Sequence, residues 1–153
     1  MNKLTYNTLW DLLDNPESRT VIATVGSDGI PEIAEATVVH QTEPDRLYYL
    51  EWLEKSQTNI NLTTSIWFDR IVKLLVFNGD DIVKVKAVVA KNHISGQLFF
   101  NYYNEALKSK PTFDLTGVWE LEITGIESVN PADEVERHRA AHPGMIHLDR
   151  IAK

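Results

Sequence analysis

A short polar segment, residues 54–60, carries the side chains best suited to hold an anion. It reads EKSQTNI and places the Lys55 ammonium, the Ser56 hydroxyl and the Asn59 amide at the predicted start of a helix. Exposed backbone N–H groups at a helix N-terminus, with a lysine and a hydroxyl beside them, form a common phosphate-binding arrangement. The alternative is a capped surface helix, and the spacing alone favours that alternative.

A second group of donors lies on the strand predicted over residues 81–91. Lys84 and Lys86 share one face of this strand, and the other face carries Val83, Val85, Ala87 and Val89. This alternation is typical of a strand that is covered on one side only. We therefore expect the lysine face to be open or occupied by a ligand.

The histidines are weaker candidates for a metal site. Glu134, His138 and His142 are four residues apart in a helix predicted over residues 131–142, so the three side chains share one face. The surrounding tail is rich in Glu, Arg and His, which is typical of a solvent-facing helix. We interpret the predicted helix as solvent-facing and predict no metal site.

These groups need a scaffold, and the sequence predicts one made of strands. The run TVIATV at residues 20–25, followed by GSDGIP, predicts a β-hairpin that turns at residues 26–31. A tight Gly79-Asp80 turn is predicted to join two later strands. The six predicted strands span residues 20–25, 33–40, 46–51, 70–78, 81–91 and 117–127. Six strands with few helices suggest a barrel.

Helices are predicted at the start of the chain and between the strands. Leucines at near-helical spacing predict an opening helix that stops at Asn15-Pro16, and Asn130-Pro131 is a suitable start for the last helix. The predicted helices cover about residues 4–13, 54–62, 95–108 and 131–142. No internal repeat or linker divides the sequence, so we expect one domain over residues 1–153 with a C-terminal helix and tail.

Composition limits the classes of function. The 153 residues are 43% hydrophobic, which is enough for a folded core, and the formal net charge is −7. That negative charge argues against non-specific binding to nucleic acid or to an anionic membrane surface. The absence of cysteine excludes disulfides and thiolate metal sites. No run reaches the roughly 20 apolar residues of a membrane span, and no signal-peptide core is evident, so we expect a cytoplasmic protein.

The order of the segments over about residues 20–131 resembles the pyridoxamine 5'-phosphate oxidase-like FMN-binding split-barrel family. The segments are TVIATVGSDGIPEIAEATVV, RLYYLEWLEKSQTNI, VKVKAVVAK and GVWELEITGIESVNP. The family's motifs read like ATxxxDGxP, KTxxN and QVKGxA; each is weak alone, and their joint order carries the resemblance. The implied fold is mainly β, a six-stranded antiparallel split β-barrel with flanking helices.

The resemblance implies that FMN is the cofactor. Lys55 and Ser56 would bind the FMN phosphate with support from Asn59, and Lys84 and Lys86 would donate to the ring or the phosphate. The backbone of Ala36, Thr37 and Val38 would run along the flavin ring, with Tyr49 and Leu50 beside the ribityl chain.

Two departures from the family pattern affect the expected function. Glu35 stands where a cation would assist phosphate binding, so we expect modest affinity for FMN. The signature by which the true oxidases hold their vitamin substrate is not evident in the tail RHRAAHPGMIHLDRIAK. Oxidation of pyridoxamine phosphate is therefore not implied.

Three functions remain open from the sequence. The resemblance implies an FMN-dependent oxidoreductase or electron carrier, active as a homodimer with its site between subunits, that meets a small-molecule substrate or redox partner. A second reading is a flavin-free or weakly binding module that senses or sequesters a small ligand, which Glu35 favours. A third is an F420- or haem-binding relative, and haem fits less well because no axial ligand is well placed.

Overall fold

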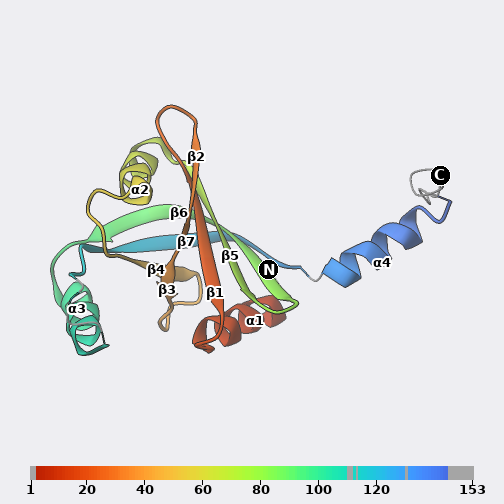
Figure 1. Cartoon of the computed structure of the whole chain (residues 1–153), viewed down its shortest axis with the longest axis horizontal. Helices are drawn as coiled ribbons and strands as arrows, with labels where there is room; N and C mark the ends of the chain where they lie inside the picture. The colour runs from red at the N-terminus through yellow and green to blue at the C-terminus, as the bar shows by residue number, and fades with distance from the viewer. Residues whose placement is uncertain (1–2, 110–111, 113, 130, 145–153) are drawn as a thin grey trace.

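The computed structural model describes residues 3–109, 112, 114–129 and 131–144, and this part of the chain forms seven strands and four helices (Figure 1). The strands are β1 (Arg19–Val25), β2 (Pro31–Glu35), β3 (Thr37–Val39), β4 (Arg46–Glu51), β5 (Ile71–Asn78), β6 (Asp81–His93) and β7 (Gly117–Val129). The helices are α1 (Lys3–Asp14), α2 (Gln57–Phe68), α3 (Gln97–Ser109) and α4 (Pro131–Ala141).

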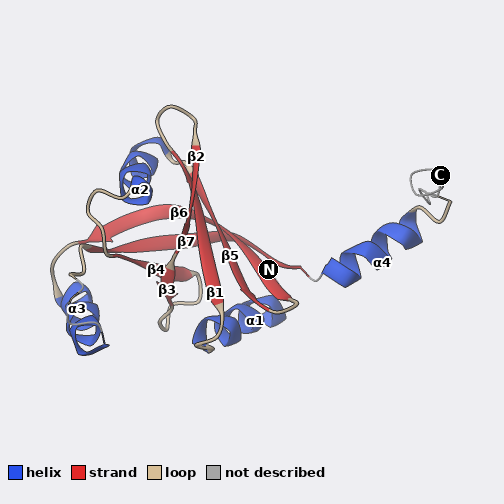
Figure 2. Ribbon diagram, in the orientation of Figure 1, coloured by secondary structure: helices blue, strands red, loops and turns tan. Residues whose placement is uncertain are grey.

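All seven strands belong to one curled antiparallel sheet, ordered β2-β1-β5-β6-β7-β4-β3 (Figure 2). The predicted hairpin at residues 26–31 is confirmed, because β1 and β2 pair with Val25 opposite Pro31. The predicted Gly79-Asp80 turn is confirmed too: Asn78 pairs with Asp81, and Gly79 has a φ of 58°, which favours glycine.

The seventh strand arises because the run predicted as one strand at residues 33–40 divides at Ala36. β2 pairs with β1 at one edge of the sheet, whereas β3 pairs with β4 at the other edge. Ala36 between them donates its N–H to the carbonyl of Thr20 at 2.8 Å. One continuous segment therefore spans both edges, which is how the sheet forms a split barrel.

Helix α2 begins later and ends later than the predicted residues 54–62. It begins after Ser56, whose side chain accepts the N–H of Asn59, and it ends before Asp69, which has left-handed backbone geometry. Thr63 and Thr64 donate their hydroxyls to carbonyls one turn earlier, at Asn59 and Ile60. These bonds accommodate a threonine pair inside a helix, where sequence patterns favour an end.

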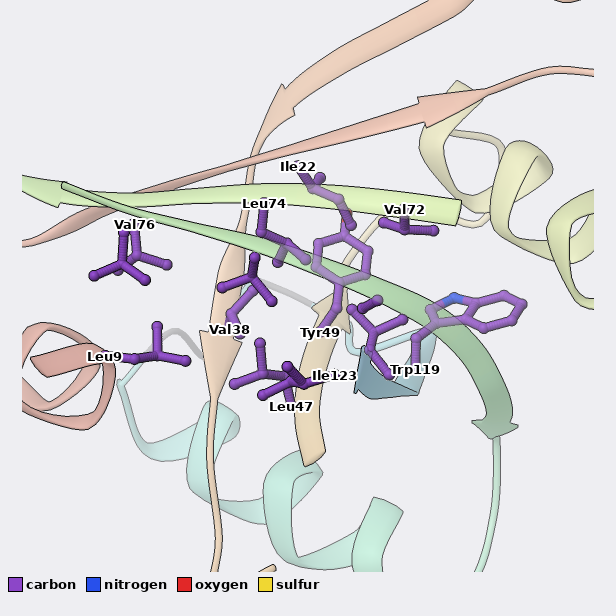
Figure 3. Packing of buried hydrophobic residues seen from close by; sticks show 14 of the residues in the cluster. Leu9, Ile22, Val38, Leu47, Tyr49, Val72, Leu74, Val76, Trp119 and Ile123 are labelled. Carbon is purple, nitrogen blue, oxygen red and sulfur yellow. The ribbon is translucent and has the colours of Figure 1, made fainter. Parts of the chain in front are cut away.

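The main core lies inside the curl of the sheet (Figure 3). Alternating residues of the strands point into it, among them Ile22, Leu74 and Trp119, and Leu9 of α1 is fully buried against them. The predicted inward faces of β6 and β7 are confirmed, since Val83, Val85, Ala87, Trp119, Leu121 and Ile123 are all buried.

A second, smaller cluster packs on the other face of β4. Tyr48 and Leu50 meet Phe99 of α3, together with Leu115 and Val118. Strand β4 is therefore buried on both faces, and Phe99, Tyr102 and Tyr103 of α3 pack in this cluster.

Helix α4 lies apart from the barrel in Figure 1, and each of its side chains that the structure describes is exposed. The predicted capping residue, Asn130, lies outside the described residues. None of the described helices is long and apolar enough to cross a membrane.

Candidate functional site

The predicted phosphate-binding segment lies between β4 and α2 and is folded upon itself. Ser56 caps α2: its Oγ accepts the N–H of Asn59 at 3.0 Å. The same hydroxyl donates to Glu51 Oε2 at 2.9 Å. Both hydrogen-bonding functions of Ser56 are thus used within the chain.

The carboxylate of Glu51 is the centre of this segment. Glu51 is the last residue of β4, follows Leu47 and Tyr49 on the core-facing side, and is only 3% exposed. Besides Ser56, it accepts hydrogen bonds from the Tyr49 hydroxyl at 2.8 Å and the Leu53 backbone N–H at 3.0 Å. Burial, and then the hydrogen bond to Glu51, raises the pKa of the Tyr49 hydroxyl, which keeps it a donor.

Asn59 is also committed to bonds within the chain. Its Nδ2 donates to the Glu54 carbonyl at 2.9 Å, and its Oδ1 accepts the indole N–H of Trp119 at 2.9 Å. Lys55 is exposed and forms no hydrogen bond or ion pair with the described residues. Of the three predicted phosphate ligands, the lysine side chain is therefore available, Ser56 is bonded within the chain, and Asn59 keeps one N–H of its amide.

Lys84 and Lys86 line a different feature, a pocket of about 440 Å³ on the outer face of the sheet. The pocket has an apolar floor, and Lys73 of β5 adds a third ammonium group to its walls. None of these lysines forms an ion pair within the part of the chain that the structure describes. The lining residues are Val21, Ala23, Ile33, Lys73, Leu74, Leu75, Lys84, Val85, Lys86, Gly125, Ile126 and Glu127.

The pocket has the size and composition of a small-molecule site. Its volume falls in the range of roughly 300–1,000 Å³ that is usual for ligand pockets. Three cations and one carboxylate, Glu127, surround an apolar floor on a chain of net charge −7, and this excess of positive charge favours a ligand that is both apolar and anionic. Lys55, Ser56 and Asn59 do not line it.

The structure brings together the two segments predicted to flank the flavin. In the β3–β4 ladder Thr37 lies opposite Leu50, and Val38 lies opposite Tyr49. The side chains of Val38, Tyr49 and Leu50 are buried in the two cores. Ala36 is half-buried and Thr37 is exposed, so contacts from this ladder to a ligand would come mainly from the backbone.

Glu35, the predicted obstacle to an anion, is paired with a cation. Arg19 donates to Glu35 Oε1 at 3.1 Å and to Oε2 at 3.0 Å, and both side chains are exposed. The hydrogen bond from Arg19 holds the pKa of the Glu35 carboxyl below its usual value. The charge of Glu35 is therefore offset locally.

Sequence reasoning missed two residues of these sites, Glu51 and Lys73. Glu51 continues the alternation of Leu47 and Tyr49, which marks it as core-facing. Lys73 alternates with buried Val72 and Leu74 in β5, and it lies opposite Lys86. Both alternation patterns are present in the sequence, but placing Lys73 beside Lys86 also requires the strand register.

Two of the histidines considered as metal ligands, His138 and His142, lie side by side at the C-terminal end of α4. The rings of His138 and His142 are 4.9 Å apart on the exposed face of α4 and beyond its end. No group of three His, Cys, Asp or Glu side chains with metal-binding geometry is found among the described residues.

Solved structures with the same architecture establish the class of fold. An FMN-binding protein from Syntrophomonas wolfei matches with a TM-score of 0.69 at 16% identity, covering 85% of this chain and 89% of its own. HupZ from group A Streptococcus matches with a TM-score of 0.68 at 15% identity, covering 82% and 94%. A candidate pyridoxamine 5'-phosphate oxidase from Lactobacillus delbrueckii matches with a TM-score of 0.57 at 21% identity, covering 83% and 93%.

The protein thus has the split-barrel fold of the pyridoxamine 5'-phosphate oxidase-like proteins. No family model and no curated protein sequence matches the chain. Other proteins of the same fold are named as an F420 reductase and as the haem storage protein HutZ from Vibrio cholerae, at 17% and 11% identity. Proteins with this fold therefore carry names that refer to three different ligands, and the fold alone does not select among them.

The donors of this chain fit FMN through their cations. Lys73, Lys84 and Lys86 can neutralise a phosphate, and the apolar floor beside them suits an aromatic ring. The hydroxyl of Ser56 and the amide of Asn59 do not line this pocket, and both already form hydrogen bonds within the chain.

Proposed function

We propose that the protein is an FMN-binding flavoprotein, an oxidoreductase or electron carrier that acts as a homodimer. The observation that carries the proposal is the open pocket of Lys73, Lys84 and Lys86 over an apolar floor. It occurs on a fold shared with an FMN-binding protein. Bound FMN would supply the redox chemistry through its ring, while the protein would bind and orient it.

A second copy of the chain is part of this proposal. Lys84 and Lys86 line the outer-face pocket, whereas Lys55 adjoins α2 and does not line it. One chain therefore presents the predicted cofactor residues in two separate places. Two copies packed through their lysine faces would set Lys55 of one beside the pocket of the other.

The exposed face around the pocket supports the same packing. Ile33 is 70% exposed on β2, and Ile71 is 49% exposed on β5. Burying such side chains contributes about 25 cal/mol per Å² of apolar surface, which favours association of this face with another copy.

In the proposed dimer each residue group has a separate task. The three pocket lysines neutralise the phosphate, and Lys55 of the other copy adds a fourth cation. The β3–β4 ladder does not line the pocket of its own chain, so backbone N–H and C=O groups from it would reach the ring only from the other copy. Closing the pocket with a second protein surface removes water from the ring.

The first test is a visible absorption spectrum of the purified protein before and after adding FMN and removing the excess. We expect flavin bands that stay with the protein, and a dimer by light scattering. A monomeric protein that stays colourless after the addition of FMN would contradict the proposal and favour a flavin-free ligand-binding module. Retention of F420 or haem instead would assign the pocket to those ligands.

A further inference from the structure

Glu51 is a buried carboxylate that no cation neutralises. Its three hydrogen-bond donors, the Tyr49 hydroxyl, the Leu53 N–H and the Ser56 hydroxyl, are all neutral. No lysine, arginine or histidine lies within ion-pair distance of it among the described residues. The carboxylate is therefore held by neutral donors, with no ion pair to a described residue.

The neighbour most affected is the first turn of α2. Ser56 caps this turn and bonds Glu51 directly, so the carboxylate lies at the end of the helix where backbone N–H groups point outward. An anion at this end stabilises the helix. The Glu51 carboxylate thus lies at the helix N-terminus, where the negative charge of a ligand phosphate would otherwise lie.

A phosphate brought to the same turn would meet two obstacles. It would find the Ser56 hydroxyl already donated to Glu51, and it would lie close to the like charge of that buried carboxylate. Asn59 would offer at most one N–H of its amide, because the other is donated to the Glu54 carbonyl.

We propose that Glu51 is a specificity-determining residue that excludes a phosphate from the first turn of α2. This inference rests on the proposed flavin function and deepens it. The flavin is then held chiefly through its ring and the lysine pocket, and the phosphate adds less to affinity than in a site with a free helix end. Wild-type protein should therefore discriminate less between FMN and riboflavin, which differ only by the phosphate, than a variant that lacks the Glu51 charge.

The test compares FMN and riboflavin binding to the wild type and to Glu51→Gln, measured by flavin fluorescence quenching on the full-length protein. Glutamine keeps the size and one acceptor oxygen but removes the charge. We expect the ratio of the riboflavin Kd to the FMN Kd to rise about tenfold, the effect of one charge-assisted contact. Glu54→Gln is the matched control: it removes an exposed carboxylate three residues away, and its ratio should change less than about twofold because solvent screens it.

A ratio that is equal in the wild type and Glu51→Gln, with FMN still bound, would overturn the inference and leave the proposed function intact. Glu51→Thr is a second charge-free variant in case glutamine does not fold. Its hydroxyl can replace one of the lost bonds in a smaller volume.

A measurement without flavin separates the two proposals. Inorganic phosphate is titrated into ¹⁵N-labelled wild type and Glu51→Gln. The two reporters are the Trp119 indole N–H, which donates to Asn59 Oδ1, and the Asn59 backbone N–H, which donates to Ser56 Oγ. We expect saturable shifts of both signals in the variant only. Shifts in both proteins, or in neither, would overturn the role of Glu51. If neither flavin binds the wild type, the proposed function fails, and this titration still decides the role of Glu51.

Discussion

The indole N–H of Trp119 donates to Oδ1 of Asn59 at 2.9 Å and joins β7 to the first turn of α2 across 60 residues of sequence. Trp119 is 2% exposed, so its N–H has no access to water as a replacement acceptor. This bond ties the segment predicted to hold a ligand to the barrel core.

Asn59→Ala should destabilise the protein through this bond. The change leaves the Trp119 indole N–H buried and unpaired, which costs about 1–3 kcal/mol in the free energy of unfolding. Urea unfolding followed by circular dichroism measures the change. Asn104→Ala on the exposed side of α3 is the control and should shift the midpoint little. Equal midpoints for both variants would show that the Trp119 bond contributes no net stability.

Leu121→Ala tests whether the interior of the curled sheet is the main core. Leu121 is fully buried on β7, and its truncation leaves a cavity that costs about 2–5 kcal/mol. Leu53, by contrast, is 67% exposed, so Leu53→Ala should change stability by less than about 0.5 kcal/mol. Similar losses in the two variants would contradict the burial of Leu121.

The fold was predictable where turns and alternation coincide. Strand β4 has the predicted bounds, residues 46–51, because the polar segment 41–45 precedes it and the helix cap follows. The division of residues 31–39 into β2 and β3 was not predictable in this way. Period-two alternation identifies a strand but does not say which edge of the sheet it joins, and this run joins both.

The candidate sites were predictable in part, for a related reason. Local spacing placed Ser56 and Asn59 at the start of a helix, where Ser56 caps α2 and Asn59 lies in its first turn. It also placed Lys84 and Lys86 on the face of β6 that points away from the core. It did not reveal that Ser56 and Asn59 are bonded within the chain. The Trp119 bond comes from a strand 60 residues away and forms only in the folded barrel, whereas the Glu51 bond is local and depends on the inward direction of the last residue of β4.

Stability should fall at alkaline pH as buried tyrosines are forced to ionise. Burial, and then the nearby Glu43 carboxylate, raises the pKa of the Tyr48 hydroxyl from 10.0 to about 12. Above pH 10 the unfolded chain loses this proton while the folded chain keeps it, so the unfolded state binds fewer protons and unfolding becomes more favourable as pH rises. The stabilisation is fully present below pH 10 and is lost as pH rises through about 12.

Urea unfolding between pH 9 and pH 12 measures this effect, with phenolate absorbance as a second signal. Tyr48→Phe should lower the dependence of stability on pH in this interval, since it removes one of the shifted groups. Tyr103→Phe is the control, because Tyr103 lies in the same cluster beside Phe99. The same slope in the wild type and Tyr48→Phe would show that Tyr48 does not contribute to alkaline unfolding.

Mixing two defective variants tests whether each flavin site needs two chains. Lys55→Ala alters only the α2 side of the proposed site, and the double variant Lys84→Ala/Lys86→Ala alters only the pocket side. Each homodimer has two damaged sites and should bind FMN more weakly than the wild type, by tenfold or more if each lost phosphate contact contributes about 1.5–3 kcal/mol.

A mixed dimer has one site with both alterations and one site with neither. After exchange of subunits, FMN binding at wild-type affinity should therefore return to about half of the mixed dimers' sites. Two copies of the same variant, taken through the same exchange, are the control. If mixing restores no tight site although light scattering shows a dimer, Lys55 and the pocket lysines do not act together across the interface.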